Sequence, residues 1–345
     1  MEFITFAKGE MNFSDQLFKM IKGISSVIQQ KRSNLIILDT FLCDYDKDYY
    51  TPISNIFNLQ EINVYLKKYN ITLIDKHNFQ FELLKVEYGT KEENIDITQE
   101  IKEKFYENKK LFIDKTLVFN SLKGDPCFNT VKRVWISYNL NGCIYSDEYS
   151  EVLQKNIDYT NENYKYFNSS IILNNNQDIF QDILIHLVYS KKFYDLSTSI
   201  LSKQNITNKV NIIHLIIEDE SVQILTKRKN FLLQNFKEKL SNKYIQLIKD
   251  HIQKTDTTII LTKSLIKNPV IDFLNQNNYN YFIPRKHFEY SELNAIADFI
   301  HSKKCNNVFI GNFNYNTMNG SSLSYYIKNT INTNVIYKSI DFDQI

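Results

Sequence analysis

Residues 8–16 form a short polar segment whose residue types could bind a sugar hydroxyl or an anion. Gly9 permits a tight turn or a close approach of the backbone. Asn12 or Ser14 can cap the helix that follows, and the free N–H groups of that helix would then bind the ligand. Glu10 adds a carboxylate to the same loop. The spacing also fits an ordinary turn between a strand and a helix with an exposed glutamate.

A second candidate site lies where the apolar run 210–217 meets three acidic residues, Glu218, Asp219 and Glu220. A buried strand that ends in this way places carboxylates at the carboxyl edge of a sheet, where ligands of α/β proteins bind. There they could accept hydrogen bonds from ribose, base or acceptor hydroxyl groups. His214 lies inside the run, and a histidine in apolar surroundings is either a core residue with satisfied hydrogen bonds or a catalytic group.

A third candidate site near the C-terminus has the residue types of a phosphate site. A predicted strand leads into Gly311 and Asn312, and after a polar loop Gly320 precedes Ser321 and Ser322, which open a helix. Backbone N–H groups and hydroxyls at a helix start can hold a phosphate through the positive end of the helix dipole. Ser321 could instead be only an N-cap. Neither a Walker sequence nor G-x-G-x-x-G occurs, which disfavours a kinase or a classical NAD enzyme.

Apolar β-rich runs alternate with amphipathic runs in both halves of the chain, which is typical of strands joined by crossover helices in a parallel sheet. The first half begins with a strand–helix–strand unit in which Leu17, Ile21 and Ile24 share one helix face. The predicted strands of this half are 3–7, 34–39, 72–74, 81–86 and 133–138, and the predicted helices are 13–30 and 101–108.

The alternation restarts after a polar stretch, residues 148–176, which we assign to the zone between two domains. We therefore expect two α/β domains of similar size, residues 1–175 and 176–345, that face one another. The predicted helices of the second half are 178–189, 194–201, 231–253, 269–275, 289–301 and 321–329, and the predicted strands are 210–217, 258–262, 279–283 and 307–310. The loops expected to bind ligands follow the carboxyl ends of strands, after residues 7, 217, 262 and 310.

The composition excludes several classes of protein. The 345 residues exceed the length at which a single hydrophobic core stops growing, roughly 250–300 residues, which supports two domains. The formal net charge of +2 leaves no excess of positive charge for a phosphate polymer, so we predict no nucleic-acid partner. Only 7 glycines occur, so each should occupy a position that requires it.

The ends of the chain and the cysteines indicate where the protein acts. The first residues show no basic segment followed by a long apolar run, and no apolar run reaches the roughly 18 residues of a membrane span. We therefore expect a cytoplasmic protein without a membrane span. The 4 cysteines are far apart, with no histidine at metal-ligand spacing, which predicts free thiols and no metal site.

The three candidate sites together resemble those of the GDP-fucose O-fucosyltransferase-like glycosyltransferases of the GT-B class, including divergent members in microbes and large DNA viruses. Residues 9–13 are similar to the family's glycine-containing first loop, and residues 210–220 to its H-x-R strand with an acidic tail. Residues 309–324 are similar to its nucleotide-sugar loop. The resemblance covers most of the chain in order and implies an α/β protein of the GT-B fold, with two Rossmann-like domains that face each other across a cleft.

The resemblance implies transfer of fucose or a similar deoxyhexose from a nucleotide-diphosphate donor, GDP-linked, to a hydroxyl group of a glycan or another acceptor. The transfer would proceed with inversion and without a metal or another cofactor. The donor would lie mainly on the C-terminal domain and the acceptor mainly on the N-terminal domain. A viral member would act in the host cytoplasm.

The resemblance also implies roles for individual residues. Glu10 lies where some members place a general base, and closure of the cleft would give its pKa a useful value by desolvation. Ser321 and Ser322 would bind the departing diphosphate through amides and hydroxyls, and Asn12 and Phe13 would contact the acceptor. The residues implied in donor binding are Gly9, His214, Glu218, Asp219, Gly311, Asn312, Gly320, Ser321 and Ser322.

One departure from the family pattern concerns the leaving group. The family's arginine two residues after the histidine is Ile216 here, and isoleucine cannot neutralise a departing diphosphate. Either another cation substitutes for it or activity is lost. The possible substitutes are Arg228, Lys263 and Arg285, of which Lys263 is the best placed because it directly follows a predicted strand.

Two other functions compete with the enzyme hypothesis. The first is a catalytically silent sugar-nucleotide or glycan-binding protein, which kept the fold after it lost the arginine. The second is a structural partner protein that neither binds nor turns over a nucleotide sugar. Binding without release of free nucleotide from the donor would favour the first, and absence of both would favour the second.

Overall fold

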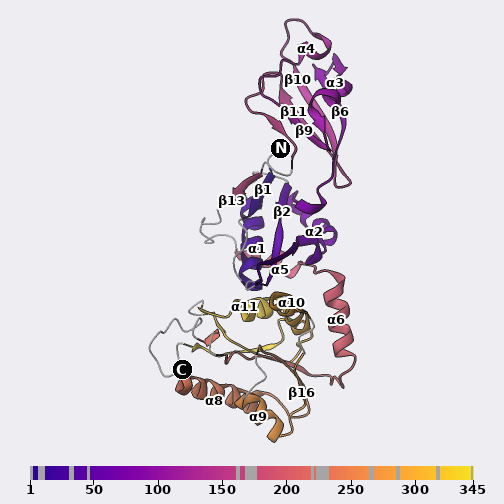
Figure 1. Ribbon diagram of the computed structural model, residues 1–345. Coiled ribbons are helices and arrows are strands. Elements are labelled where there is room, and N and C mark those ends of the chain that lie inside the picture. The colour runs from indigo at the N-terminus through magenta and orange to yellow at the C-terminus, as the bar shows by residue number, and fades with distance from the viewer. Residues whose placement is uncertain are drawn as a thin grey trace.

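The computed structural model describes residues 3–6, 12–30, 35–44, 47–160, 164–167, 177–218, 221–222, 233–263, 268–284, 288–315, 319–342 and 345. Figure 1 shows an elongated molecule with three tiers. An antiparallel β module, here called the distal module, occupies one end. A first α/β part lies in the middle, and a second α/β part occupies the other end.

A parallel sheet with the strand order β13-β1-β2-β5 forms the centre of the first α/β part. Its strands are β1 (Phe3–Phe6), β2 (Leu35–Leu38), β5 (Thr72–Asp75) and β13 (Tyr164–Phe167), and its helices are α1 (Phe13–Gln30), α2 (Leu59–Leu66) and α5 (Gln177–Ile185). The predicted strands near 3–7, 34–39 and 72–74 are confirmed, and α1 has the predicted bounds. β13 lies in the stretch that we assigned to the zone between the domains, and it returns the chain to β1. The division at residues 175 and 176 stays a prediction.

The two faces of β2 explain how the first sheet is held. Ile36 and Leu38 point into the core that α1 helps to form, whereas Leu35 and Ile37 point into the core of the distal module. Because side chains of a strand alternate between its faces, a fully apolar strand is buried on both sides. Next to this sheet, β3 (Thr40–Asp44) and β4 (Tyr49–Pro52) form a separate hairpin.

The distal module differs from the sequence prediction, because its strands are antiparallel and do not continue the parallel sheet. Asn141 and Gly142 form a tight turn with positive φ at both residues, which is the strongest short-range signal of a β-hairpin. The turn forces β10 and β11 to pair antiparallel, with Leu140 opposite Cys143. The elements of the module are β6 (Phe81–Gly89), β7 (Asn94–Asp96), α3 (Thr98–Phe105), β8 (Tyr106–Glu107), β9 (Lys110–Ile113), α4 (Asn120–Lys123), β10 (Arg133–Leu140), β11 (Cys143–Ser150) and β12 (Ile157–Asp158).

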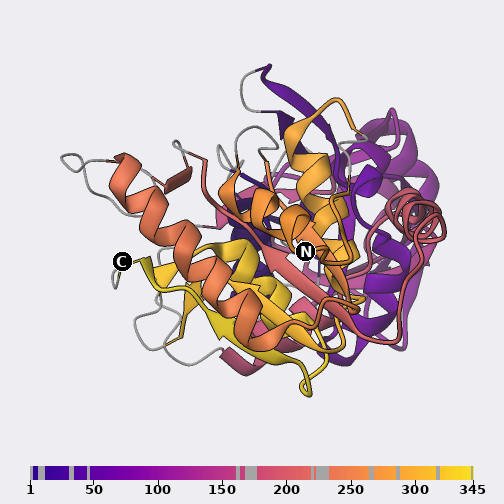
Figure 2. The ribbon, with the colours of Figure 1, turned by 90° about the horizontal axis from the view of Figure 1, so that it is seen from below.

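A five-stranded parallel sheet with the order β16-β15-β14-β17-β20 forms the centre of the second α/β part. Ile213 of β14 and Ile260 of β15 pack in the core with α8 and α9, whereas Ile212 and Ile259 pack in the core with α10 and α11. Helices therefore cover both faces of the sheet, as Figures 1 and 2 show. The elements are α6 (Lys191–Leu201), β14 (Val210–His214), α8 (Leu233–His251), β15 (Thr257–Leu261), α9 (Pro269–Gln276), β16 (Tyr281–Phe282), α10 (Ser291–Ser302), β17 (Val308–Gly311), α11 (Ser322–Thr330) and β20 (Ile336–Ser339).

The two α/β parts meet through helices. α1 and α5 of the first part contact α10 and α11 of the second, and one apolar core runs through the junction. The ring of Phe13, at the start of α1, packs against the rings of Tyr189 and Phe299. This shared core fixes the start of α1 against the second α/β part. A site between the two parts requires the start of α1 in this position.

Two findings concern the expectations about membranes and metals. No helix within the described residues is both long enough and apolar enough to cross a membrane. The same residues contain no group of three or more His, Cys, Asp or Glu side chains that could hold a metal ion. Cys43, Cys127 and Cys305 are buried free thiols.

Candidate functional site

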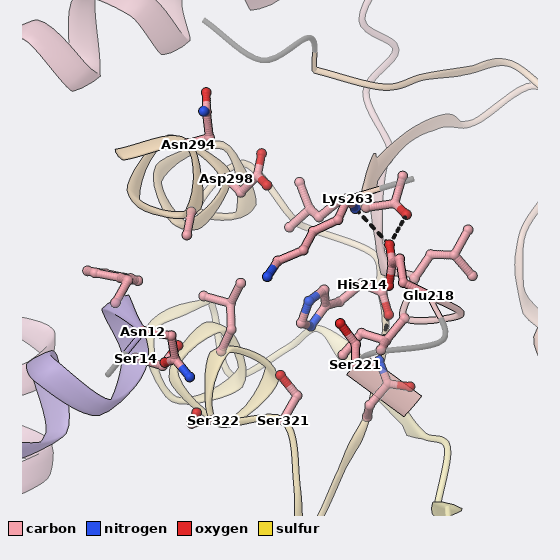
Figure 3. A pocket seen from close by; sticks show the side chains of 18 of the residues that line it. Asn12, Ser14, His214, Glu218, Ser221, Lys263, Asn294, Asp298, Ser321 and Ser322 are labelled. Carbon is pink, nitrogen blue, oxygen red and sulfur yellow. Dashed lines mark hydrogen bonds between the residues drawn. The ribbon is translucent and has the colours of Figure 1, made fainter. Parts of the chain in front are cut away.

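A pocket lies between the N-terminus of α1 and the carboxyl ends of β14, β15 and β17 (Figure 3). Its volume is about 600 Å³, which is within the range of small-molecule sites, roughly 300–1,000 Å³. The first α/β part contributes residues 12–15, and the second contributes the loops that follow three strands. The structure therefore brings together the loops expected after residues 217, 262 and 310. The loop after residue 7 lies outside the described residues.

His214 is held at the carboxyl end of β14 by a hydroxyl group from α11. Its Nδ1 lies 2.8 Å from Oγ of Ser324, and the same oxygen accepts the backbone N–H of Asn312 at 2.9 Å. We therefore assign the Ser324 hydrogen to the bond with Nδ1, which leaves the proton of the neutral ring on Nε2. Within the described residues Nε2 has no hydrogen-bond partner, so it can donate to a ligand. Burial, and secondarily the charge of Lys263, lowers the pKa of His214 to about 4, which keeps the ring neutral near pH 7.

Asn312 holds the loop after β17 against β14 and also lines the pocket. Its side-chain nitrogen donates to the carbonyl of His214 at 2.6 Å, and its Oδ1 lies 2.7 Å from the hydroxyl of Tyr244. Its carbonyl accepts the N–H of Ser321 at 2.8 Å, and the side chain is buried. The polar groups of its side chain are used within the protein, which gives Asn312 a structural role, and its role in donor binding stays a prediction. Tyr244 also accepts the N–H of Ile216 at 3.1 Å.

The start of α11 offers an anion-binding position. Ser321 is the N-cap, and its Oγ accepts the N–H of Ser324 at 3.5 Å. The N–H groups of Ser322 and Leu323 have no acceptor among the described residues, and both residues line the pocket. Free N–H groups in the first turn carry the positive end of the helix dipole. The N-cap role of Ser321 and the phosphate site thus coexist.

Two glycines allow this close arrangement. Gly320 has φ of +121°, and a Cβ at this position would lie 1.9 Å from the carbonyl oxygen of Asn312. A Cβ at Gly311 would lie 3.1 Å from Oγ of Ser324, on the same hydroxyl that holds His214. Gly320 therefore occupies a position that requires the absence of a side chain, and a side chain at Gly311 would press on the Ser324 hydroxyl.

Lys263 is the only lysine or arginine among the described residues that line the pocket. Its backbone N–H donates to Oε1 of Glu218 at 2.9 Å, and the hydroxyl of Thr262 donates to the same oxygen at 3.1 Å. Glu218 therefore fixes the loop from which Lys263 extends. Figure 3 shows the Lys263 side chain reaching into the pocket between His214 and Asp298. Ile216, where the resemblance expects an arginine, also lines the pocket.

Phe13 lines the pocket, and its contact with the acceptor stays a prediction. The ring is only 1% exposed and packs in the core of the junction. The backbone N–H of Phe13 instead donates to Oε2 of Glu292 in α10. Asn12 caps α1, since its Oδ1 accepts the N–H of Asp15 at 3.1 Å, and it remains exposed at the rim of the pocket.

Several predicted residues fall outside the described part of the chain, namely Gly9, Glu10, Asp219, Arg228 and Arg285. Sequence reasoning also missed residues that the structure places in or next to the pocket. Ser324, Tyr244 and Glu292 come from three different helices. Of these, only Ser324 had a sequence signal, because it lies three residues after the N-cap.

The low pKa of His214 predicts a loss of stability in acid. The unfolded histidine takes up a proton below its ordinary pKa of about 6.5, whereas the folded one does so only near pH 4. The free energy of unfolding should therefore fall by about 2 kcal/mol from this group as the pH falls from about 6.5 to 5. Urea unfolding at both pH values measures this change. In the His214→Gln variant the free energy of unfolding should fall less between these two pH values than in wild-type protein. An equal fall in both proteins would show that His214 is charged or exposed in the folded state.

Two parallel sheets, each with Rossmann-like alternation, and a pocket at the carboxyl ends of the second sheet define a protein of the GT-B fold. Solved structures agree over the full length of the chain. The crystal structure of POFUT1 in complex with GDP-fucose matches with a TM-score of 0.54 and 10% identity and covers 98% of this chain and 98% of that chain. The complex of POFUT1 with GDP matches with a TM-score of 0.52 and 11% identity and covers 99% and 98%. The apo form of POFUT1 gives a TM-score of 0.52 at 11% identity, with 98% of both chains covered.

At these identities the likeness shows the fold, and the expected GT-B fold is confirmed. No family profile matches the sequence, and no curated protein sequence matches it. The pocket geometry must therefore carry any argument about activity.

Proposed function

We propose that the protein transfers a sugar from a nucleotide-diphosphate donor to an acceptor hydroxyl. The donor would be GDP-linked fucose or a similar deoxyhexose, and the transfer would invert the anomeric centre. The observation that carries this proposal is the grouping of a neutral His214, the ammonium of Lys263 and the free N–H groups of α11 in one pocket. The solved structure of POFUT1 in complex with GDP-fucose, which shares the fold, supports the choice of donor.

Each of these groups has a task in the proposed transfer. The N–H groups of Ser322 and Leu323 bind the diphosphate, and Lys263 stabilises the negative charge that develops on it as the bond to the sugar breaks. His214 donates its Nε2–H to the donor while it remains uncharged. In this proposal Lys263 replaces the arginine that the family has at the position of Ile216.

GDP should stabilise the protein if the pocket binds the donor. At about 100 times the Kd, a ligand that binds only the folded state raises the free energy of unfolding by about 2.7 kcal/mol. We expect a rise in Tm of several degrees with GDP or GDP-fucose. The rise should be smaller for Ser322→Ala, which keeps the backbone N–H but loses the hydroxyl that the resemblance also implies in diphosphate binding. Ser121→Ala, in the exposed helix α4, is the matched control and should respond as the wild-type protein does. No change in Tm across a panel of nucleotides would refute the proposal.

A second function, binding without turnover, is favoured by one observation. Ile216 provides an apolar side chain where the resemblance expects a cation. If Lys263 does not compensate, the protein would bind GDP-fucose and release no GDP. Measurement of free GDP after incubation with GDP-fucose, with water or a panel of glycans as acceptor, separates this function from sugar transfer.

A further inference from the structure

Glu292 provides a carboxylate at the boundary between the two α/β parts. It is half-buried in the first turn of α10 and lines the pocket beside the start of α1. Its Oε2 accepts the backbone N–H of Phe13, which lies 279 residues away in the sequence. Within the described residues, Oε1 accepts only the hydroxyl of Ser291, at 3.2 Å. The carboxylate is therefore held through one oxygen, while the other can accept a hydrogen bond from a ligand.

The surroundings of Glu292 make it a better base than an exposed glutamate. Burial raises the pKa of Glu292, while the N–H of Phe13 and the charge of Lys263 act in the opposite direction. The charged and titratable groups that face it are Lys263 after β15, and Cys43 and Asp44 on β3. A general base is most effective when its pKa approaches the working pH, and desolvation moves a carboxylate in that direction.

We propose that Glu292 is the general base that takes the proton of the acceptor hydroxyl, an inference that rests on the proposed sugar transfer. Oε1 of Glu292 accepts the proton while the hydroxyl oxygen forms a bond to the anomeric carbon of the donor. The bond between that carbon and the β-phosphate oxygen breaks, and its electron pair leaves with the diphosphate. Lys263 and the start of α11 stabilise the charge on that group. Glu10, which the resemblance implies as the base, then has no proton-transfer role.

The experiment compares Glu292→Gln with wild-type protein in the release of GDP from GDP-fucose, with water as the acceptor. The glutamine keeps an oxygen that can accept the N–H of Phe13 but cannot take a proton, so the fold should be retained. We expect the rate to fall by about 100-fold, with the affinity for GDP and the Tm unchanged. The wild-type rate should rise with pH as Glu292 loses its proton, and this rise should be absent in the variant.

One control variant and one variant of the competing base test the assignment. Glu289→Gln removes an exposed glutamate at the same boundary, where it pairs with Lys47 at 2.8 Å outside the pocket, and should keep the wild-type rate. Glu10→Gln removes the carboxylate that the resemblance implies as the base, and we expect it to lose much less of the rate than Glu292→Gln does. A wild-type rate in Glu292→Gln, or a hundredfold loss in Glu10→Gln alone, would overturn the assignment of the base while leaving the sugar transfer intact.

Other outcomes separate this inference from the proposed function. If wild-type protein binds GDP but releases none from GDP-fucose, then the protein is a binding protein and Glu292 has no catalytic role. If wild-type protein does not bind GDP, both proposals fail. A loss of rate in Glu292→Gln that is accompanied by an equal loss of GDP affinity or a large drop in Tm would assign Glu292 to the architecture of the cleft, and the inference would be wrong.

Discussion

We expect Lys263→Ala to release GDP from GDP-fucose about 10²–10³ times more slowly than wild-type protein, because loss of one group that stabilises developing charge typically costs this much in kcat. Among the described residues, Lys263 is the only lysine or arginine in the pocket, and Ile216 cannot take its place. The bonds from Lys263 and Thr262 to Glu218 fix the loop through the backbone and a neighbouring side chain. The substitution should therefore remove the charge without moving the loop. Single-turnover release of GDP measures the effect.

Two further variants show whether the lost charge causes the slower release of GDP. Lys263→Arg keeps a cation at the end of a long side chain and should stay within about tenfold of the wild-type rate. Lys254→Ala removes an exposed lysine before the amino end of β15, far from the carboxyl end that faces the pocket, and should leave the rate unchanged. If Lys263→Ala keeps the wild-type rate, then the diphosphate is stabilised elsewhere and the role of Lys263 in the proposed reaction is wrong.

The strands and helices of the second α/β part could be predicted because the sequence patterns that indicate them are local. The strands β14 and β15 are apolar runs bounded by polar residues, and α9 begins with Asn268 as N-cap and Pro269 in the first turn. Each of these patterns spans fewer than about 20 residues, and the element that it predicts is determined by residues close together in the sequence. The same holds for α1, whose apolar face repeats at helical spacing and lies buried in the structure.

The distal module was not predicted because its pairing depends on contacts between distant segments. β6 lies between β10 and β7 in the sheet, although its residues carry the same apolar character as the strands of the parallel sheet. The turn at Asn141 and Gly142 is a local signal that β10 and β11 pair antiparallel, but it does not specify that β10 also pairs with β6. β13 is a similar case, since a short run of aromatic residues gives no sign of its partner β1.

The candidate site could also be predicted only in part, because some of its contacts join segments that are distant in the sequence. Loops at the carboxyl ends of strands could be identified from the sequence, and Gly320 and Ser321 stood out by residue type. The hydroxyls of Ser324 and Tyr244, which fix His214 and Asn312, belong to helix faces that pack on the strands. Their roles depend on which helix covers which end of the sheet, and no spacing within the sequence encodes this.

We expect Gly320→Ala to abolish GDP binding and to lower the free energy of unfolding by about 3 kcal/mol or more, because steric overlap is added to a strained backbone that alone costs about 1–3 kcal/mol. The new Cβ would lie 1.9 Å from the carbonyl oxygen of Asn312 and 2.9 Å from Cα of Phe313, both of which belong to the backbone. Backbone atoms cannot move aside as a flexible side chain can. The same carbonyl accepts the N–H of Ser321, so any shift displaces the start of α11.

Gly124→Ala separates backbone strain from steric overlap as causes of the lost stability. Gly124 also has a positive φ, +98°, but a Cβ there would meet nothing within 4 Å. This variant should lose only the strain, about 1–3 kcal/mol, and should bind GDP as wild-type protein does. Urea unfolding and calorimetric titration with GDP measure both quantities. If the two variants lose the same stability and both bind GDP, then the loop before α11 can rearrange freely, and the contact between Gly320 and Asn312 does not set the position of the phosphate-binding N–H groups.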